Sequence, residues 1–452
     1  CDWSSDVCSS DLLAAVLFAG LHFAKKEMKG KEYFKGDGTV PWWVTSVSIF
    51  ATLLSPISFL SLAGNSYAGT WIMWFAQLGM LLAIPITIKF FLPIYSKLDI
   101  DTAYHYLELR FGSKGLRVLG AVMFIVYQIG RMSIIMYLPC MVLGSLTGIS
   151  VNLLIIIMGV IAIIYSYTGG LKSVLWTDFI QGSVLLIGVT FALVFLLVHL
   201  DGGFGAIAHA FTAEHKFLAV DQPIFNANIF KDSVFIMIVG AGFNTMGSYV
   251  SSQDIVQRFT TTTDTKKLNK MMLTNGALSI FIATVFYLIG TGLFVFYKQN
   301  ALPPAAAQDQ IFASYIAFEL PVGVTGLLLA AIYAAAQSTL STGLNSVASS
   351  WALDIQSNLS KEELGFEKET KIGQRVSLAV GIFSIVVAMV LANGGVKSAY
   401  EWFNGFMGLV LGILIGTFIL GAFTKVANTF GATAAFIAAS AVMVYIKYFV
   451  PA

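Results

Sequence analysis

The chain has 452 residues, of which 57% are hydrophobic and 11% are charged, and its mean hydropathy is +0.81. Soluble domains carry about 25% charged residues, so this composition excludes a soluble enzyme with a single membrane anchor. The net charge of +2 provides no basic field for nucleic acid. The three cysteines, Cys1, Cys8 and Cys140, show neither a disulfide framework nor metal-ligand spacing.

The first residues, "CDWSSDVCSSDL", are polar and acidic and lead directly into the apolar run "LAAVLFAGLHFA". A secretory signal peptide begins with basic residues instead. We therefore expect residues 1–11 to be a non-native leader and the first helix to be truncated.

Apolar runs long enough to cross a bilayer, about 20 residues each, recur along the whole chain. They predict an all-α polytopic membrane protein with about twelve transmembrane segments. The expected segments are 12–24, 40–64, 70–94, 116–148, 151–168, 174–200, 232–252, 271–297, 318–351, 374–393, 400–422 and 428–449.

The distribution of Lys and Arg orients these segments. If the loop 25–39 is cytoplasmic and every segment crosses, 20 of the 26 Lys and Arg residues fall on the cytoplasmic side and 5 fall outside. Shifting one crossing destroys this asymmetry. We therefore expect a multi-pass protein of the inner (cytoplasmic) membrane with loop 25–39 in the cytoplasm. The remaining cation, Arg131, falls inside a segment.

Two segments at matching places in oppositely oriented halves are interrupted. Segment 40–64 contains Pro56 and Gly64, and segment 232–252 contains Gly240 and Gly242. Paired broken helices of this kind indicate a transporter built from an inverted repeat. The alternative is that Pro and Gly are simply common in membrane helices.

Arg131 lies in "MFIVYQIGRMSIIMYLP". A charge at the centre of a membrane helix costs roughly 3 kcal/mol and usually has a function. It can attract an anionic substrate group or pair with an internal acid. Tyr127 and Gln128 lie within one helical turn and can share its face.

Asp178 lies in "YTGGLKSVLWTDFIQG", shortly after Lys172. A carboxylate at this position offers a hard oxygen ligand for a cation or carries a proton. An equally good reading is an acid that stabilises the N-terminus of its own helix.

Pro56 in "SIFATLLSPISFLSLAGNS" cannot donate a backbone hydrogen bond, so carbonyl groups in the stretch 51–54 are candidates to leave the helix ladder. Ser55 and Ser58 add hydroxyls beside them. Freed carbonyls at a helix break are suitable ligands for Na⁺. Otherwise the break is a kink whose backbone groups are satisfied by a neighbouring helix.

A stripe of small polar residues lies in "AAAQSTLSTGLNS". Ala335, Ser338, Thr339 and Thr342 share one helix face, and Ser341 flanks it. Facing the break in 40–64, this stripe would complete a cage of oxygens. By itself such a stripe is more often a close-packed helix interface.

Three stretches resemble the sodium:solute symporter family: "GGLKSVLWTDFIQG", "SSQDIVQRF" and "GLLLAAIYAAAQSTLSTGLNSVASSWALDI". The resemblance runs from "KEYFKGDGTVPWW" to "FVPA". Within the family, "FATLLSPISFLSLAGNSYAGTW", "YHYLELRF" and "IGRMSIIMYL" are similar to bacterial sodium/sialic acid symporters. The family implies a LeuT-type five-plus-five inverted repeat with flanking helices, and a further helix beyond residue 452.

The resemblance assigns the parts of the chain as follows: 1–11 leader, 12–39 first helix and cytoplasmic loop, 40–200 first repeat, 201–231 extracellular loop, 232–422 second repeat and 423–452 C-terminal flanking helix.

The resemblance also implies binding residues. A primary Na⁺ site maps to the backbone carbonyls of Ala51, Leu54 and Ala335 and the hydroxyls of Ser338 and Thr339. A second Na⁺ site maps to Asp178, Ser338, Ser341 and Thr342. Substrate contacts map to Ser55, Ser58, Arg131 and Gln77. Members with sialic acid as substrate can carry Thr at positions 53 and 58 and an aromatic residue at 73, where this chain has Leu53, Ser58 and Met73.

The sequence thus predicts a secondary active transporter that couples Na⁺ to uptake of an anionic sugar, with sialic acid as the named substrate and two Na⁺ per cycle. Another sugar, a carboxylate vitamin or an amino acid is the alternative cargo, and a membrane sensor is an alternative class. We expect Na⁺, the substrate and the lipid bilayer as partners, with no nucleic acid and no obligatory protein partner. No Ser/His/Asp or metal constellation indicates an enzyme.

Overall fold

The computed structural model describes residues 31–98, 100–227, 233–300, 310–360, 365–394 and 399–449, and within them all regular structure is helical. The helices are α2 Lys31–Lys35, α3 Trp42–Leu53, α4 Pro56–Ala68, η1 Trp71–Trp74, α5 Phe75–Leu78, α6 Met80–Ile86, η2 Thr87–Phe91, α7 Leu92–Lys97, α8 Ala103–Phe111, α9 Lys114–Thr147, α10 Val151–His199 and α11 Gly203–Ala213. They continue with α12 Val234–Ser251, α13 Gln253–Phe259, α14 Thr265–Gln299, α15 Ile311–Phe318, α16 Val322–Ser349, η4 Ser350–Gln356, α17 Ser357–Leu359, α18 Phe366–Asn393, α19 Ala399–Phe423 and α20 Thr429–Phe449.

Among the described residues, seven helices are long and apolar enough to cross a membrane, and the bent pair α3–α4 passes the same test as one span. Three shorter apolar helices, Val151–Ile164, Val410–Phe423 and Thr429–Tyr445, fall in the remaining predicted segments. Every predicted segment from 40–64 onward therefore has a helical counterpart. The predicted segment 12–24 lies outside the described residues, so the count of twelve stays a prediction.

The first predicted break is present between α3 and α4, which meet at an angle of 65°. Leu54 leaves the helical region with φ −85° and ψ 100°, and Pro56 begins α4, where its missing N–H costs nothing. The Ser55 hydroxyl caps α4 by accepting a hydrogen bond from the Ser58 amide at 3.3 Å. Gly64 does not interrupt the chain, because it lies within α4.

The second break is also present, but not at the predicted glycines. Gly240 and Gly242 lie inside the regular helix α12, and the chain breaks at Ser252, with φ −90° and ψ 117°, before α13 begins. Gly242 serves packing instead. A Cβ on Gly79 would lie 2.4 Å from the Gly242 amide nitrogen, so the two glycines let α12 approach the α5–α6 junction closely.

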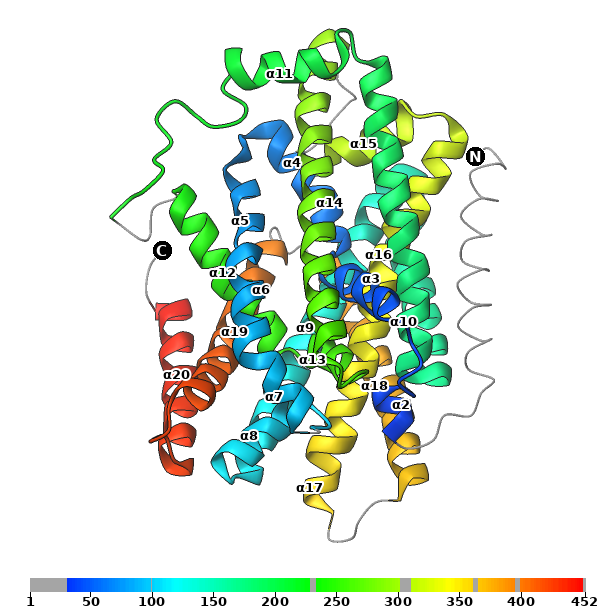
Figure 1. Ribbon diagram of the computed structural model, residues 1–452. Helices are drawn as coiled ribbons and strands as arrows, with labels where there is room; N and C mark the ends of the chain where they lie inside the picture. Colours follow the sequence, from blue (N-terminus) through cyan, green and yellow to red (C-terminus); the bar gives the residue numbers. More distant parts are fainter. Residues whose placement is uncertain are drawn as a thin grey trace.

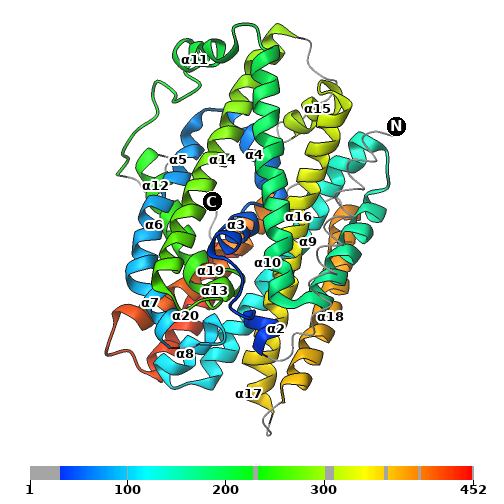
Figure 2. The same ribbon diagram turned by 45° about the vertical axis from the view of Figure 1, so that its right-hand side comes forward.

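Both break points are buried in the bundle, since Leu54 is 9% exposed and Ser252 is 2% exposed. Figures 1 and 2 place α3 and α4 near its middle, with α10, α14 and α16 around them and α13 beside α3. The same views show α11 and α15 at one end of the molecule, and α2, α8 and α17 at the other. Each break therefore faces protein rather than lipid, which is where unpaired backbone groups are tolerated at membrane depth.

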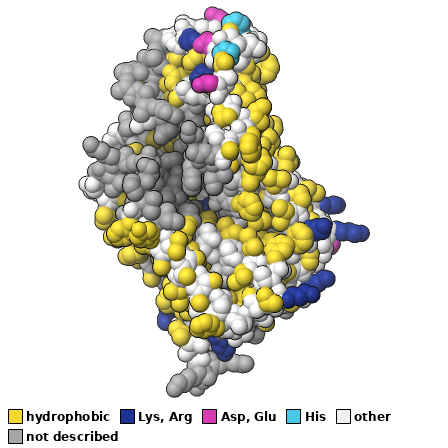
Figure 3. All heavy atoms as spheres, turned by 90° about the vertical axis from the view of Figure 1, so that its left-hand side faces the viewer, with side chains coloured by type: hydrophobic (Ala, Val, Ile, Leu, Met, Phe, Trp, Pro, Cys, Tyr) yellow, Lys and Arg dark blue, Asp and Glu magenta, His cyan; other side chains and the backbone are white. Residues whose placement is uncertain are grey.

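Charged side chains concentrate toward the two ends of the molecule. On the face in Figure 3, hydrophobic side chains cover much of the described surface, most of the visible Lys and Arg lie in the lower half, and His and most of the visible Asp and Glu lie at the top together with some Lys or Arg. Two residues from the predicted cytoplasmic set are not loop charges, however. Arg258 is fully buried and Arg117 is 7% exposed, each in an ion pair with a buried Asp. The tally of 20 cytoplasmic Lys and Arg residues includes both, and a buried, paired cation carries little weight in such a tally, so the orientation stays a prediction.

The N-terminal loop is tied to a kink in α10. Gly170 adopts φ 57° and ψ −163° there, and a Cβ on it would lie 2.7 Å from the Tyr33 carbonyl oxygen. Lys172 donates to Asp37 at 2.6 Å and to Thr39 at 2.7 Å. Burial raises the pKa of Asp37, but hydrogen bonds from Lys172 and Thr39 outweigh burial and lower that pKa to about 2. The carboxylate therefore remains ionised at neutral pH and the tie persists.

Replacing Gly170 tests the kink. We expect Gly170→Ala to destabilise the protein by about 1–3 kcal/mol, because its backbone region is essentially restricted to glycine and the new methyl group meets Tyr33. The measurement is the thermal unfolding midpoint of the protein in detergent. Gly240→Ala is the control, since a Cβ there meets nothing within 4 Å. An equal loss in both variants would contradict this account of Gly170.

Candidate functional site

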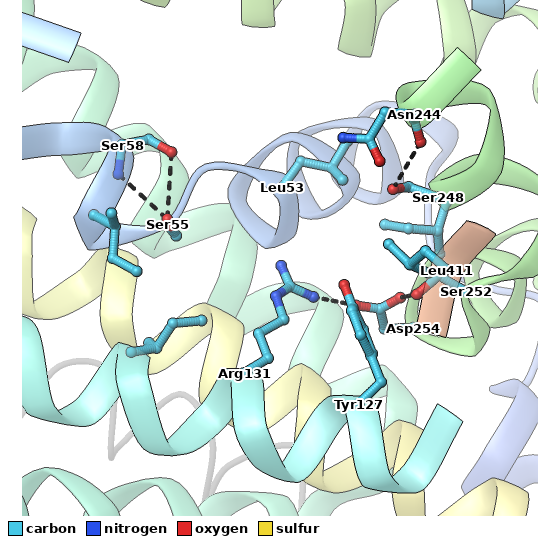
Figure 4. Close-up of a pocket in the computed structure, with 13 residues that line it drawn as sticks. Leu53, Ser55, Ser58, Tyr127, Arg131, Asn244, Ser248, Ser252, Asp254 and Leu411 are labelled. Atoms are coloured by element: carbon cyan, nitrogen blue, oxygen red, sulfur yellow. Dashed lines mark hydrogen bonds and ion pairs between the residues drawn. The ribbon is translucent and has the colours of Figure 1, made fainter. Parts of the chain in front are cut away.

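A cavity of about 500 Å³ opens between the two helix breaks. The α3–α4 junction contributes Leu53, Ser55, Ile57 and Ser58; α9 contributes Tyr127, Arg131 and Ile135; α12 contributes Asn244 and Ser248; Ser252, Asp254, Ile255 and Leu411 complete the lining. Figure 4 shows the Arg131 side chain extending into this space between Ser55 and Asp254. The cavity therefore combines a buried cation, several hydroxyls and an amide, as a polar anionic ligand requires.

Arg131 is held on two sides. One guanidinium nitrogen donates to the Asp254 carboxylate at 2.6 Å, and the other donates to the Thr52 carbonyl oxygen at 2.8 Å. The Thr52 carbonyl is available because α3 ends at Leu53. Sequence reasoning left open whether Arg131 attracts a ligand or pairs with an internal acid. The structure shows the ion pair and also places the guanidinium in the cavity wall.

Ser55 and Ser58 lie at the N-terminus of α4, facing the same cavity. Their hydroxyl oxygens are 3.3 Å apart. A helix N-terminus carries partial positive charge and unpaired amide groups, so it favours an anion. Ser55, Ser58 and Arg131 are thus brought together as predicted. Gln77 lies in α5, outside the set that lines this cavity, and its substrate contact stays a prediction.

The residues of the predicted primary Na⁺ site also converge. The Ser338 hydroxyl donates to the carbonyls of Ala51 and Ala335, each at 3.1 Å, and Thr339 donates to Ala335 at 3.1 Å. Leu54 is the C-terminal cap of α3, directly after the last helical residue. These oxygens are neutral and belong to α3 and α16. If the two hydroxyls rotate, they present lone pairs to an ion instead of protons to carbonyls.

The predicted second Na⁺ site is built around Asp178 of α10. Its Oδ2 accepts hydrogen bonds from Ser48 at 2.6 Å and from Thr342 at 3.2 Å. Its Oδ1 is buried and has no hydrogen-bond partner among the described residues. The Ser341 hydroxyl instead donates to the Ser338 carbonyl, at 3.2 Å, within α16. The structure therefore joins Asp178 to Thr342, with Ser338 and Ser341 on the adjacent turn of α16.

Sequence reasoning missed a buried cation in this second site. The Arg258 guanidinium lies 2.7 Å from Asp178 Oδ2 and 2.6 Å from the Thr342 hydroxyl. It also donates to Ser48 at 2.9 Å. Arg258 follows Asp254 by one helical turn in "SSQDIVQRF". That spacing of opposite charges directly after a break was the available signal.

Asn244 and Ser248 were also missed, although they line the cavity from α12. They lie four residues apart, so they share one face of the helix. The Ser248 hydroxyl donates to the backbone carbonyl of Asn244 at 3.3 Å. The side-chain amide of Asn244 is not used in this bond, and it faces the cavity (Figure 4). Two polar residues at this spacing in an apolar helix were a signal for a ligand-facing surface.

Comparison with known proteins identifies the family to which this chain is similar. A model of the sodium:solute symporter family matches residues 33–439. The chain is 36% identical to the sodium/sialic acid symporter SiaT of Proteus mirabilis over 92% of this chain and 84% of that protein. It is 31% identical to the sodium/sialic acid symporter NanT of Aliivibrio fischeri over 96% of this chain and 86% of that one.

Similar solved structures support the same family and the same fold. A Na⁺-coupled sialic acid symporter in a substrate-bound outward-open state superimposes with a TM-score of 0.91 and 33% identity, covering 99% of this chain and 92% of that one. The nucleobase-cation-symport transporter Mhp1, at 15% identity, gives a TM-score of 0.58 and covers 90% of this chain and 91% of its own. Mhp1 shares the fold alone, and it supports the predicted LeuT-type fold. The chain therefore belongs to the sodium:solute symporter family: it is a membrane-spanning, sodium-coupled transporter and not an enzyme.

Proposed function

We propose that the protein is a sodium/sialic acid symporter of the bacterial inner membrane that works by alternating access. The observation that carries the proposal is the α3–α4 junction. On one side of it, Ala51 contacts Ser338 of the ion site. On the other side, Ser55 lines the cavity with Arg131. An ion and an anionic sugar would thus bind to opposite sides of the same short stretch of backbone. The names of the SiaT and NanT relatives support sialic acid as the cargo.

The cavity has suitable groups for an acidic sugar. The substrate carboxylate would bind at Ser55, Ser58 and Arg131, where the α4 N-terminus and the guanidinium both favour negative charge. Asn244 and Ser248 would bind sugar hydroxyls from the opposite wall. Leu53 lines the cavity with an apolar side chain, so it offers shape rather than a hydrogen bond. Gln77 would join only through a rearrangement that brings α5 closer.

Sodium would bind at two places. The primary site uses Ala51, Leu54, Ala335, Ser338 and Thr339, and its occupation would join α3 to α16. The second site, described above, would use Asp178 with the hydroxyls of α16. In alternating access, both ions favour the state that admits substrate, and the loaded bundle then reorients.

Two ions are energetically sensible for an anionic cargo. At about 100 mV, each charge moved inward yields roughly 2.3 kcal/mol. A tenfold Na⁺ gradient adds about 1.4 kcal/mol per ion. One Na⁺ with one carboxylate is electroneutral and supports only about tenfold accumulation. Two Na⁺ carry one net charge and provide roughly 5 kcal/mol, enough for accumulation on the order of a few thousandfold.

The halves and the orientation follow the same proposal. The broken pairs α3–α4 and α12–α13 would each begin an inverted repeat, over 40–200 and 232–422, with 201–231 as an extracellular loop and 423–452 as a flanking helix. The Lys-rich end that carries α2 would face the cytoplasm, with loop 25–39, whose described part is 31–39, on that side.

Reconstituted transport tests the proposal directly. In proteoliposomes, an inward Na⁺ gradient should drive uptake of sialic acid, and an inside-negative potential should increase it because net positive charge enters. The measurement is uptake of labelled sialic acid, with a panel of another sugar, a carboxylate vitamin and an amino acid as competitors. Equal uptake in Na⁺ and K⁺ media would remove the sodium coupling.

The carboxylate role of Arg131 has its own test. Arg131→Gln should raise the KM for sialic acid by about 10–100-fold, since hydrogen bonds to charged groups contribute about 1.5–3 kcal/mol. Because this change also unpairs Asp254, Ser58→Ala gives a second test that keeps the ion pair, with a smaller rise expected. Ser61→Ala, on the same helix but outside the cavity lining, is the control. Unchanged KM in both site variants would refute the carboxylate site.

The second sodium is tested through Asp178. Asp178→Asn should lower the Hill coefficient for Na⁺ from about two to about one, because the charged ligand of one ion is lost. The readout is initial uptake rate against Na⁺ concentration. Asp201→Asn, at an exposed residue in the turn that follows α10, should leave the coefficient unchanged. A coefficient that stays near two in Asp178→Asn would exclude this site.

A further inference from the structure

Arg258 occupies the second ion site in the described structure. Its Nη2 bridges Asp178 Oδ2 and the Thr342 hydroxyl, the two groups that the structure joins there. The side chain is fully buried, as is Asp178. Arg258 comes from α13, whereas Asp178, Thr342 and Ser48 come from α10, α16 and α3. A single guanidinium thus links four helices at the point where Na⁺ is proposed to bind.

Na⁺ and this guanidinium compete for the same charge. Asp178 Oδ2 already accepts hydrogen bonds from Ser48, Thr342 and Arg258, which fills its coordination. Two cations around one buried carboxylate leave one charge uncompensated, and an uncompensated buried charge is strongly unfavourable. Asp178 Oδ1 remains buried without a partner among the described residues, so the site retains ligand capacity for an incoming ion.

We propose that Arg258 is a tethered counter-cation: it holds the place of the second sodium while the transporter is ion-free, and Na⁺ binding at Asp178 displaces it. The inference rests on the proposed second sodium site. Its consequence is that Asp178 never faces the protein interior without a cation. An empty transporter can therefore reorient without exposing a bare carboxylate, which the outward return step requires.

The displacement also reaches the substrate cavity through α13. Arg258 donates to the backbone carbonyl of Asp254, and the Asp254 side chain holds Arg131 at 2.6 Å. The second Asp254 oxygen accepts from Ser252, the residue at the helix break, at 2.5 Å. Releasing Arg258 from Asp178 frees one end of a short helix whose other end holds the substrate-binding cation. Na⁺ binding at the second site thereby changes how strongly Asp254 competes with the substrate carboxylate for Arg131.

The test is sodium binding to the purified full chain, followed by intrinsic tryptophan fluorescence as NaCl replaces choline chloride. Arg258→Gln removes the competing charge, so the concentration of half-saturation should fall by at least about threefold, whereas Arg258→Lys should stay near the wild type. Removing a merely structural arginine should weaken binding or leave it unchanged. Half-saturation that is unchanged or raised in a folded Arg258→Gln protein would overturn the proposal.

Arg117→Gln is the matched control. Arg117 is also a buried arginine, it pairs with the buried Asp354 at 2.7 Å and with Glu108 at 2.9 Å, and it lies outside the ion site. Its loss costs an ion pair of the same kind without removing a competitor for Na⁺. Tighter sodium binding in Arg117→Gln as well would show a general effect of lost ion pairs and would overturn the specific role of Arg258.

Coupling to the cavity gives a second readout. The ratio of the sialic acid Kd without Na⁺ to that with Na⁺ should be smaller in Arg258→Gln than in the wild type, since α13 is already released. An unchanged ratio would overturn the link between α13 and the cavity. Failure of the proposed transport function gives a different result from failure of the Arg258 proposal. If the wild-type protein shows no sodium-dependent fluorescence change and no sodium-dependent uptake, the proposed symport itself is refuted.

Discussion

The break before Pro56 leaves the last carbonyl groups of α3 without helical partners, and the rest of the site depends on where those groups go. The Ala51 carbonyl accepts from Ser338, and the Thr52 carbonyl accepts from Arg131. One end of a helix therefore contacts both the proposed ion site and Arg131, the cation proposed to bind the substrate. A continuous helix here would consume the same oxygens in its own ladder. The break is tolerated because α10, α14 and α16 surround it with protein (Figures 1 and 2).

Four buried charges form two ion pairs around this break, Arg131 with Asp254 and Arg258 with Asp178. At about 4 Å and an effective dielectric constant near 20, such an attraction is worth about 4 kcal/mol. Removing one partner of a buried pair costs roughly 3–5 kcal/mol. A neutral sugar brings no charge that can replace Asp254 beside Arg131, whereas a carboxylate does. The same constraint makes a cation the appropriate ligand for Asp178. Charge balance thus favours an anion beside Arg131 and a cation beside Asp178, in agreement with the proposed cargoes.

Much of this arrangement was predictable, because polar residues are costly at membrane depth and therefore conspicuous. Arg131, Asp178, the stripe from Ala335 to Thr342 and the break at Pro56 all stood out in apolar sequence. The break at Ser252 did not, since its backbone angles are open to any residue and no Pro marks it. Of the two glycines predicted to mark it, Gly242 packs against Gly79 and Gly240 lies within the regular helix α12. The burial of Arg258 was not predicted, because the segment was expected to end at 252 and no helix was expected after it, whereas Arg258 lies in the buried helix α13. Its pairing with Asp178, distant in sequence, depends on the packing of four helices, which no local pattern specifies.

The polarity of the broken helix would let the two proposed sites hold opposite charges close together. A helix carries about half a negative charge at its C-terminus and half a positive charge at its N-terminus. At the C-terminus of α3 the Ala51 carbonyl accepts a hydrogen bond from Ser338, and at the N-terminus of α4 Ser55 and Ser58 line the cavity. Leu54 and Ser55 are consecutive, so the sign of the local field reverses within one peptide unit. At the proposed sites, a sodium ion on one side and a carboxylate on the other would each meet the favourable end of a helix dipole and would attract one another across the break. The proposed sites would then bind their two cargoes cooperatively through the backbone alone, before any side chain contributes.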